Sequence, residues 1–316
     1  MVILFIVTFL ILILVASFLI IKNLFQIKEL NLNEQTRLSL PGQFIQLQKG
    51  ITHFEIQGGL CAPVVVLVHG FSTPYYIWDP TFEALIAAGF RVLRFDLFGR
   101  GFSDRPHMTY DGQLCITQLA QLLNALEIKE PVHLVGLSYG GLVAAGFAIQ
   151  FPELIHSLTL LDPLVTTAAL GKFQALNIPF FGEMLMAFYL EPFVLPKSQL
   201  LDFYQPEKFP NWENRYRHQM RHKGFSRAIL STFRNIRKMA KESEYRAIGK
   251  TKLPVLGIWG EHDQTISRED MRLLESWIPQ MRLLTIKNAG HIPHYEQPDS
   301  VNPLLIAFLK KNNSIG

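Results

Sequence analysis

The residues best suited to chemistry in this chain are a serine, an aspartate and a histidine that each follow a short apolar run. Ser138 lies in a Gly-x-Ser-x-Gly pattern, directly after the apolar residues 132–137. Asp263 and His291 come shortly after two later apolar runs. A serine hydroxyl is a weak nucleophile at neutral pH, and it needs a base whose tautomer is fixed by a carboxylate. The three residues therefore predict a nucleophile, a base and an orienting acid.

The segments on either side of Ser138 indicate how the hydroxyl would be presented. A strand-like run leads into the serine and a helix-compatible run follows at once, so the turn between them must be tight and strained. Gly136 and Gly140 allow the strand and helix backbones to approach closely. The N–H of Tyr139 would then point towards a developing oxyanion, and the N–H of Phe71, in a loop after an earlier strand, could pair with it.

Other histidines and acidic residues stand close enough in sequence to compete for the same roles. The alternatives are His262 and His294 for the base, and Glu261 and Asp162 for the acid. A glycine directly before His291 favours that histidine. Asp162 also ends a strand-like run, so the choice of acid stays open between two strand ends.

The elements around these residues predict an α/β fold. Strand-like and helical segments alternate along the chain, which is typical of a mostly parallel, doubly wound sheet. Residues 64–68 are uniformly apolar, as expected of a strand covered on both faces. Residues 44–56 alternate around a Lys-Gly pair and predict an antiparallel hairpin at the start of the sheet. His69, after the 64–68 strand, is expected to brace the oxyanion loop rather than to act as a base.

The alternation of strand-like and helical segments stops between residues 164 and 250. We expect this stretch to form a helical cap over the carboxyl edge of the sheet. Extra core helices are the alternative. The first part of this stretch is apolar and aromatic, and the residues predicted to bind substrate are Phe180, Phe181, Met184 and Phe188. Residues 43–163 and 251–316 would then form the core.

The N-terminus is expected to anchor the protein in a membrane. Residues 1–21 contain no charged side chain, and about 20 apolar residues span a bilayer as a helix. A cleaved signal peptide is the alternative, but no basic residue precedes the run. The first basic residues follow it, which places the catalytic part on the cytoplasmic side. Residues 22–42 would be a linker.

Composition excludes several classes of function. The net charge of +4 and pI near 9.0 could suggest nucleic-acid binding. The basic residues concentrate in the expected cap, however, where a solvated surface facing anionic lipid is the simpler account. The two cysteines, Cys61 and Cys115, form no disulfide framework, and no Cys/His group has zinc spacing. The glycine-rich residues 96–106 lack the pattern of a phosphate loop.

Taken together, the motifs resemble those of the α/β-hydrolases over about residues 44–310. The motifs are His69-Gly70-Phe71, Asp96-x-x-Gly99-x-Gly101-x-Ser103, Gly136-x-Ser138-x-Gly140-Gly141, Gly260-x-x-Asp263 and Gly290-His291. The resemblance implies Ser138 as nucleophile, His291 as base and Asp263 as acid. It also implies an oxyanion hole from Phe71 and Tyr139, and no metal or organic cofactor.

Within that superfamily, the apolar anchor and cap look most similar to the membrane-bound monoacylglycerol lipases. Related epoxide hydrolases and dehalogenases use an aspartate where this chain has Ser138. We therefore expect a serine esterase that acts on a small lipophilic ester at a membrane, with the oligomeric state left open. Two alternatives remain: a C–C bond hydrolase of ring-cleavage dienoates, which shares nearly the same motifs, and a catalytically silent binding module.

Overall fold

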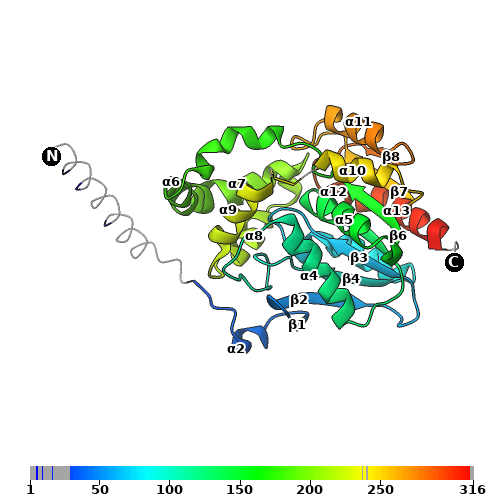
Figure 1. The fold of residues 1–316 in the computed structure, drawn as a ribbon, viewed down its shortest axis with the longest axis horizontal. Helices are drawn as coiled ribbons and strands as arrows, with labels where there is room; N and C mark the ends of the chain where they lie inside the picture. Colours follow the sequence, from blue (N-terminus) through cyan, green and yellow to red (C-terminus); the bar gives the residue numbers. More distant parts are fainter. Residues whose placement is uncertain are drawn as a thin grey trace.

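The computed structural model describes residues 29–313 apart from Arg237 and Ala240, together with Phe5, Phe9 and Ala16. Its centre is an eight-stranded sheet in the order β1-β2-β4-β3-β5-β6-β7-β8 (Figure 1). The strands are β1 (Gln43–Leu47), β2 (Gly50–Gln57), β3 (Val64–Val68), β4 (Arg91–Phe95), β5 (Val132–Leu137), β6 (Ile155–Leu161), β7 (Val255–Gly260) and β8 (Arg282–Ile286). Only β2 pairs antiparallel, with β1 and with β4, and the other pairings are parallel.

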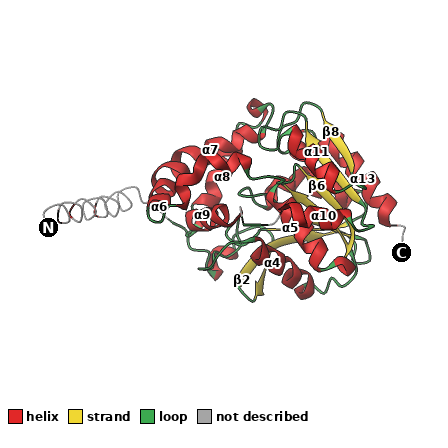
Figure 2. Ribbon diagram, turned by 45° about the horizontal axis from the view of Figure 1, so that its top comes forward, coloured by secondary structure: helices red, strands yellow, loops and turns green. Residues whose placement is uncertain are grey.

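Helices cover the sheet and form a separate layer at one end of it (Figure 2). Those in or beside the core are α2 (Glu34–Arg37), η1 (Tyr75–Trp78), α3 (Asp79–Ala87), α4 (Gly112–Ala125), α5 (Tyr139–Gln150), η2 (Pro152–Leu154), α10 (Lys241–Gly249), α11 (Arg268–Trp277), α12 (Pro293–Glu296) and α13 (Pro298–Asn313). Those between β6 and α10 are η3 (Ala168–Asn177), α6 (Phe181–Leu185), η4 (Met186–Val194), α7 (Leu195–Ser198), η5 (Gln199–Asp202), η6 (Pro206–Lys208), α8 (Trp212–Met220) and α9 (Phe225–Ile236).

The two faces of the sheet are buried in two separate apolar clusters. Along β3, Val66 packs in the cluster that contains α4 and α5, whereas Val65 packs in the one that contains α3 and α13. Successive side chains of a strand point to opposite faces, so a strand covered on both sides must be apolar at every position. All five residues of β3 are buried accordingly. The predicted α/β fold and its antiparallel first hairpin are confirmed.

The helices between β6 and β7 include a third apolar cluster of their own, which Met186 and Leu190 of η4 share with Tyr216 of α8 and Ile229 of α9. The last helix of the expected cap range behaves differently, because Tyr245 of α10 packs in the core cluster beside α5. The cap layer therefore ends before α10, and α10 covers the sheet.

The N-terminal predictions meet the structure only in part. The expected anchor, residues 1–21, lies outside the described residues apart from Phe5, Phe9 and Ala16. Within the described part of the chain, no helix is both long enough and apolar enough to cross a bilayer. The expected linker holds a short helix, α2, and Leu30 forms a parallel bridge with His222 beyond α8. The chain therefore meets the cap before it enters the sheet.

Candidate active site

Ser138 occupies the sharp turn between β5 and α5 that the sequence predicts. Its backbone has φ 53° and ψ −117°, a strained conformation for a residue with a side chain. The Ser138 N–H donates to the carbonyl of Leu161 at 2.9 Å, which fixes the turn to the neighbouring strand β6. A Cβ on Gly140 would collide with the carbonyl oxygens of Val68 and His69, so only glycine fits there.

Two backbone donors flank the serine. Within the described part of the chain, neither the N–H of Phe71 nor that of Tyr139 donates to a protein acceptor. The Phe71 loop lies close to the serine, because a Cβ on Gly70 would stand 3.5 Å from the Cβ of Ser138. Both N–H groups, with the N-terminus of α5, offer stabilisation for negative charge that develops beside Ser138.

His69 holds this loop in place, as the sequence predicts. Its Nε2 accepts a hydrogen bond from the Leu97 N–H at 2.9 Å, and its Nδ1 donates to the carbonyl of Gly70 at 2.9 Å. Burial lowers the pKa of His69 to about 4, so the ring stays neutral and can make both bonds. His69 therefore has a structural role.

Arg100 is a second brace for the loop, and the sequence offers no signal for it. Its Nε donates to the carbonyl of Phe71 at 2.9 Å, and its guanidinium lies over the Phe71 ring. The same side chain donates to the hydroxyl of Thr232 in α9 at 2.8 Å. Arg100 therefore couples the candidate oxyanion loop to the cap.

Asp263 and His291 are joined directly. The Nδ1 of His291 lies 2.7 Å from Oδ2 of Asp263, while Oδ1 of Asp263 accepts from the N–H groups of Thr265 and Ile266. Burial alone would lower the pKa of the His291 imidazole, but the Asp263 carboxylate more than offsets this and raises it to about 9. Because Nδ1 of His291 is hydrogen-bonded to Asp263, Nε2 is the ring nitrogen that can accept a proton from the nucleophile.

Asp162, the alternative acid, lies next to Asp263 rather than replacing it. It follows β6 with φ 39°, and its Oδ1 accepts from the Gly260 N–H at 2.9 Å. Burial, together with the charge of Asp263, raises the pKa of the Asp162 carboxyl well above its usual range. The charge and hydrogen bond of His291, followed by the contact with Asp162, hold the pKa of Asp263 below its ordinary value despite burial.

The other candidates for the base and the acid make contacts away from Ser138 and His291. The Nε2 of buried His294 donates to the carbonyl of Ile77, and its ring stacks near Trp78. His262 is exposed and stacks on the ring of Tyr204 at 3.9 Å. Glu261 is exposed, with its carboxylate 3.9 Å from His262. Among the residues that the sequence leaves open, only Asp263 is hydrogen-bonded to His291.

The cap contributes to the surroundings of His291 through Asp202 at the end of η5. The carbonyl of Asp202 accepts the backbone N–H of His291 at 2.7 Å. The Asp202 carboxylate also helps to raise the pKa of the His291 ring. Burial raises the pKa of Asp202 itself to about 6. The candidate base is therefore held by the sheet on one side and by the cap on the other.

Glu296 of α12 fastens the two sides together. Its Oε2 accepts from the N–H groups of Gly290 at 2.8 Å and Tyr204 at 3.0 Å, and its Oε1 accepts from the Gln205 N–H at 2.8 Å. Gly290 directly precedes the candidate base, while Tyr204 and Gln205 belong to the cap. One buried carboxylate thus fixes the loop that carries His291 against the cap.

The predicted substrate-binding residues occupy the outer layer of the cap. Phe180 is 85% exposed and Phe181 is 50% exposed, so both side chains contact solvent. Met184 and Phe188 are partly buried. A role in substrate binding stays a prediction for all four residues, Phe180, Phe181, Met184 and Phe188.

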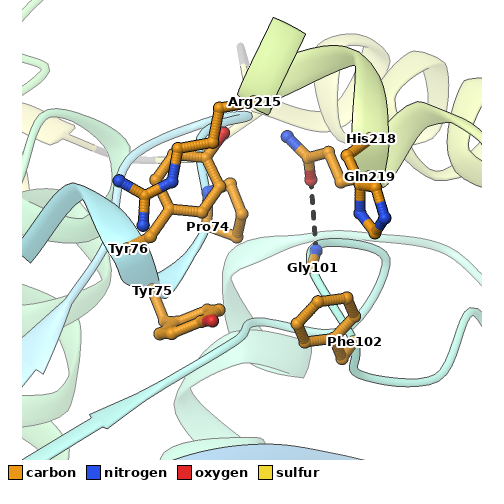
Figure 3. Close-up of a pocket in the computed structure, with 8 residues that line it drawn as sticks. All are labelled: Pro74, Tyr75, Tyr76, Gly101, Phe102, Arg215, His218 and Gln219. Carbon is orange, nitrogen blue, oxygen red and sulfur yellow. Dashed lines mark hydrogen bonds between the residues drawn. The ribbon is translucent and has the colours of Figure 1, made fainter. Parts of the chain in front are cut away.

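A cavity of about 130 Å³ lies where the cap meets the core (Figure 3). Its lining residues are Pro74, Tyr75, Tyr76, Gly101, Phe102, Arg215, His218 and Gln219. Gln219 of α8 bridges the seam, because its Oε1 accepts from Gly101 N–H and its Nε2 donates to the carbonyl of Ser72. The cavity contains none of the candidate catalytic residues, and its walls help to hold the oxyanion loop to the cap.

One group of side chains could present ligands to a metal ion. Single donor atoms of Asp162, Asp263 and His291 lie within 4.8 Å of one another. Burial, together with the neighbouring Asp263 carboxylate, raises the pKa of the Asp162 carboxyl well above its usual range. A metal ligand must be deprotonated, and the raised pKa of Asp162 works against that.

Comparison with known proteins agrees with this architecture. A family model described as alpha/beta hydrolase fold matches residues 63–298. Lipase 1 of Psychrobacter immobilis is 26% identical over 266 residues, which cover 79% of this chain and 78% of that protein.

Two solved structures share the fold. A thermophilic esterase from Thermogutta terrifontis superimposes with a TM-score of 0.73 at 22% identity, covering 86% of this chain and all of that one. A meta-cleavage product hydrolase from Pseudomonas fluorescens gives 0.72 at 22% identity, covering 85% of this chain and 98% of the other. At these identities the likeness concerns the fold alone.

Proposed function

Because this chain belongs to the α/β-hydrolase fold family, we propose that it is a serine hydrolase that cleaves lipophilic carboxylic esters through an acyl-enzyme. The observation that carries the proposal is the hydrogen bond of 2.7 Å between His291 and Asp263, at the same sheet edge as the strained Ser138 turn. The free N–H groups of Phe71 and Tyr139 beside that turn support it.

In the proposed acylation step, Ser138 Oγ attacks the ester carbonyl carbon while its proton passes to Nε2 of His291. The carbonyl oxygen gains the negative charge and accepts the N–H groups of Phe71 and Tyr139. The charge of Asp263 stabilises the imidazolium that forms. The imidazolium then gives its proton to the departing alcohol, and the acyl group stays on the serine.

Deacylation repeats these roles with water in place of the serine. His291 removes a proton from the water, whose oxygen attacks the acyl carbon. The same two N–H groups stabilise the second oxyanion. Collapse of that intermediate returns the proton to Ser138 and releases the carboxylic acid, so the net reaction is ester plus water to acid plus alcohol.

We assign a monoacylglycerol-like ester as the substrate. The apolar cap supports an acyl chain, with Met184 and Phe188 as its candidate contacts. The similarity to Lipase 1 of Psychrobacter immobilis points in the same direction. A buried acyl chain gains about 0.8 kcal/mol per methylene, which would favour longer chains until the site is full. The charge-free residues 1–21 support a single-pass membrane anchor, and the basic residues that follow them support a cytoplasmic catalytic domain.

The decisive test of the chemistry is Ser138→Ala. We expect this variant to lose ester hydrolysis and labelling by a fluorophosphonate probe while it keeps its melting temperature. Ser103→Ala, a change of the same type at a buried serine of the glycine-rich loop, controls for removal of a hydroxyl. Undiminished labelling of Ser138→Ala would remove this serine from the mechanism.

A substrate panel separates the proposed activity from its rivals. The full chain is assayed against monoacylglycerols, p-nitrophenyl esters of graded length and a ring-fission dienoate. We expect kcat/KM to climb about threefold to fourfold per added methylene and then level off. Preference for the dienoate would indicate a C–C bond hydrolase, and no turnover of any of them, with no probe labelling, would indicate a silent binding module.

A further inference from the structure

The helix formed by α6 and η4 is apolar on both of its sides. Gly182, Met186 and Leu190, spaced by four, are buried and face the rest of the cap. Tyr189 and Phe193 lie between and beyond them and are 56% and 61% exposed. Residues 186–194 form a π-helix, which is wound more widely than an α-helix, so the spacing of an α-helical face does not apply here. The burial of each side chain shows instead that buried apolar residues and exposed aromatic residues run along the same segment.

Such an outer face is unusual for a helix in contact with water, which normally carries its charged residues there. The two acidic residues of this segment are both paired with polar groups of the cap, and Glu183 is itself exposed. Glu183 pairs with Arg234 of α9, and Glu191 accepts a hydrogen bond from Ser226. The exposed aromatic residues of this segment are Phe180, Phe181, Tyr189 and Phe193, which we call the aromatic cap face. Several exposed large apolar side chains gathered on one short segment indicate a contact with a membrane or another protein.

The path of the chain indicates which contact this is. The Leu30 N–H donates to the carbonyl of Arg221 at 2.7 Å, and the Leu30 carbonyl accepts the N–H of Lys223 at 3.1 Å. The charge-free residues 1–21 therefore connect to the end of α8 in the cap and not to the sheet. Nine peptide steps separate residue 21 from Leu30, so this connection spans at most about 30 Å.

Charge on the same side of the cap complements a lipid surface. Arg221 and Lys223, which flank Leu30, are both exposed. Arg217 lies one helical turn before Arg221 and donates to the carbonyl of Pro192, beside Phe193. Aromatic side chains next to arginine and lysine are the composition of a membrane interface, where cations meet anionic headgroups.

We propose that the aromatic cap face docks on the lipid bilayer and inserts Tyr189 and Phe193 at the level of the headgroups. The inference rests on the proposed function in one respect, because a docked cap would admit a lipophilic ester directly from the bilayer. Figure 1 places α6 at the end of the molecule away from β7 and β8, and Figure 2 shows it likewise far from β8. In this orientation the sheet stands away from the membrane, and the cap lies between them.

The test measures depth in the membrane with the full chain in vesicles of phosphatidylcholine and phosphatidylglycerol. A polarity-sensitive fluorophore is attached to Phe193→Cys in a Cys61→Ser background. The matched control carries the same label on the native, exposed Cys61, between β2 and β3. We expect blue-shifted emission and quenching by lipids spin-labelled near the headgroup at position 193, and neither effect at position 61.

Equal behaviour of the two labels would overturn the proposal. A blue shift at position 193 that persists in detergent without lipid and grows with protein concentration would also overturn it, because it would show that a second copy of the chain covers the face. Labelling of Ser138 by the fluorophosphonate is measured in the same samples. Its loss would refute the proposed hydrolase chemistry without affecting the result on docking.

A functional readout uses the double variant Tyr189→Ser/Phe193→Ser. We expect about a tenfold lower rate on monoacylglycerol presented in vesicles, because two aromatic side chains no longer partition into the interface. Hydrolysis of soluble p-nitrophenyl acetate should stay within about twofold, since the chemistry at Ser138 is unchanged. Leu273→Ser, which removes an exposed apolar residue from α11, should affect neither rate. Equal loss on both substrates would show damage to the fold and contradict a docking role.

Discussion

At the level of single residues, the arrangement around His291 separates a charged acid from a neutral one. Asp263 contacts the imidazole directly, while Asp162 stands behind it with a raised pKa and a hydrogen bond to Gly260. Two carboxyl groups this close cannot both ionise easily, so one carries the charge and the other carries a proton. Asp162 is therefore best understood as a positioning residue for Asp263.

This division predicts different outcomes for two matched variants. Asp263→Asn should lower kcat roughly 10⁴-fold, by analogy with loss of the orienting carboxylate in serine proteases. Asp162→Asn should cost less than about tenfold, because a neutral amide can still donate to Asp263. Steady-state kinetics on one soluble ester decides the matter. A large loss of kcat in Asp162→Asn, with nearly normal kcat in Asp263→Asn, would show that Asp162 is the orienting acid and Asp263 the positioning residue.

The raised pKa of His291, about 9, predicts the direction of the pH dependence. A general base must be neutral, so kcat/KM should fall as pH drops through this pKa and the imidazole becomes protonated. The Asp202 carboxylate stabilises the protonated ring, and Asp202→Asn should therefore move the inflection to lower pH. The exposed Asp299→Asn is the control. An unmoved profile in Asp202→Asn would show that this charge does not act on the base.

At the level of elements, the sequence predicts those strands and turns that are determined by a short, local pattern of residues. Uniformly apolar strands such as β3 and the Gly-x-Ser-x-Gly turn are local signals, and both are present in the structure as expected. The braces of the site are not local. Arg100 meets Thr232 across 132 residues, and Glu296 meets Tyr204 across 92. No hydrophobic periodicity or sequence motif indicates such contacts, because each depends on how the cap packs against the core in three dimensions.

The clamp made by α12 can be tested with a nearly isosteric change. Glu296→Gln places a donor NH₂ against backbone N–H donors of Gly290, Tyr204 or Gln205, and leaving a buried donor unpaired costs about 1–3 kcal/mol. We expect a lower melting temperature and a reduced kcat on short esters, since the loop of His291 loosens. Glu275→Gln, on the exposed side of α11, should change neither. Wild-type kcat in Glu296→Gln would show that the clamp serves stability alone.

At the level of the whole molecule, the protein consists of a sheet that carries the candidate triad and a cap that carries apolar surface. The exposure of Phe180 and Phe181 could not be predicted from sequence, because an apolar helix that lines a pocket and one that faces a membrane have the same composition. The attachment of Leu30 to the end of α8 was equally hidden, since nothing in the expected linker indicates a partner nearly 200 residues away.

The proposed anchor predicts how the whole protein partitions. Expressed in full, it should stay with the membrane pellet through an alkaline carbonate wash, because residues 1–21 carry no charge. A variant with Leu10→Arg and Val15→Arg should be released far more readily, since each arginine at a helix centre costs about 2.5–3.5 kcal/mol on insertion scales. A mature N-terminus beginning after Ser17 would identify a cleaved signal peptide instead.

The backbone hydrogen bond from His291 to Asp202 has a consequence for protein engineering. The cap of this protein is an attractive part for recombination, since it is a single insertion between β6 and β7. A chimera cut at those strands would replace Asp202, whose carbonyl accepts the backbone N–H of His291. It would also replace Thr232, the partner of Arg100, and Tyr204, the partner of Glu296. Swapping the cap would thus alter turnover as well as substrate range, and a graft that preserves rate would have to carry the residues equivalent to Asp202, Tyr204 and Thr232 with it.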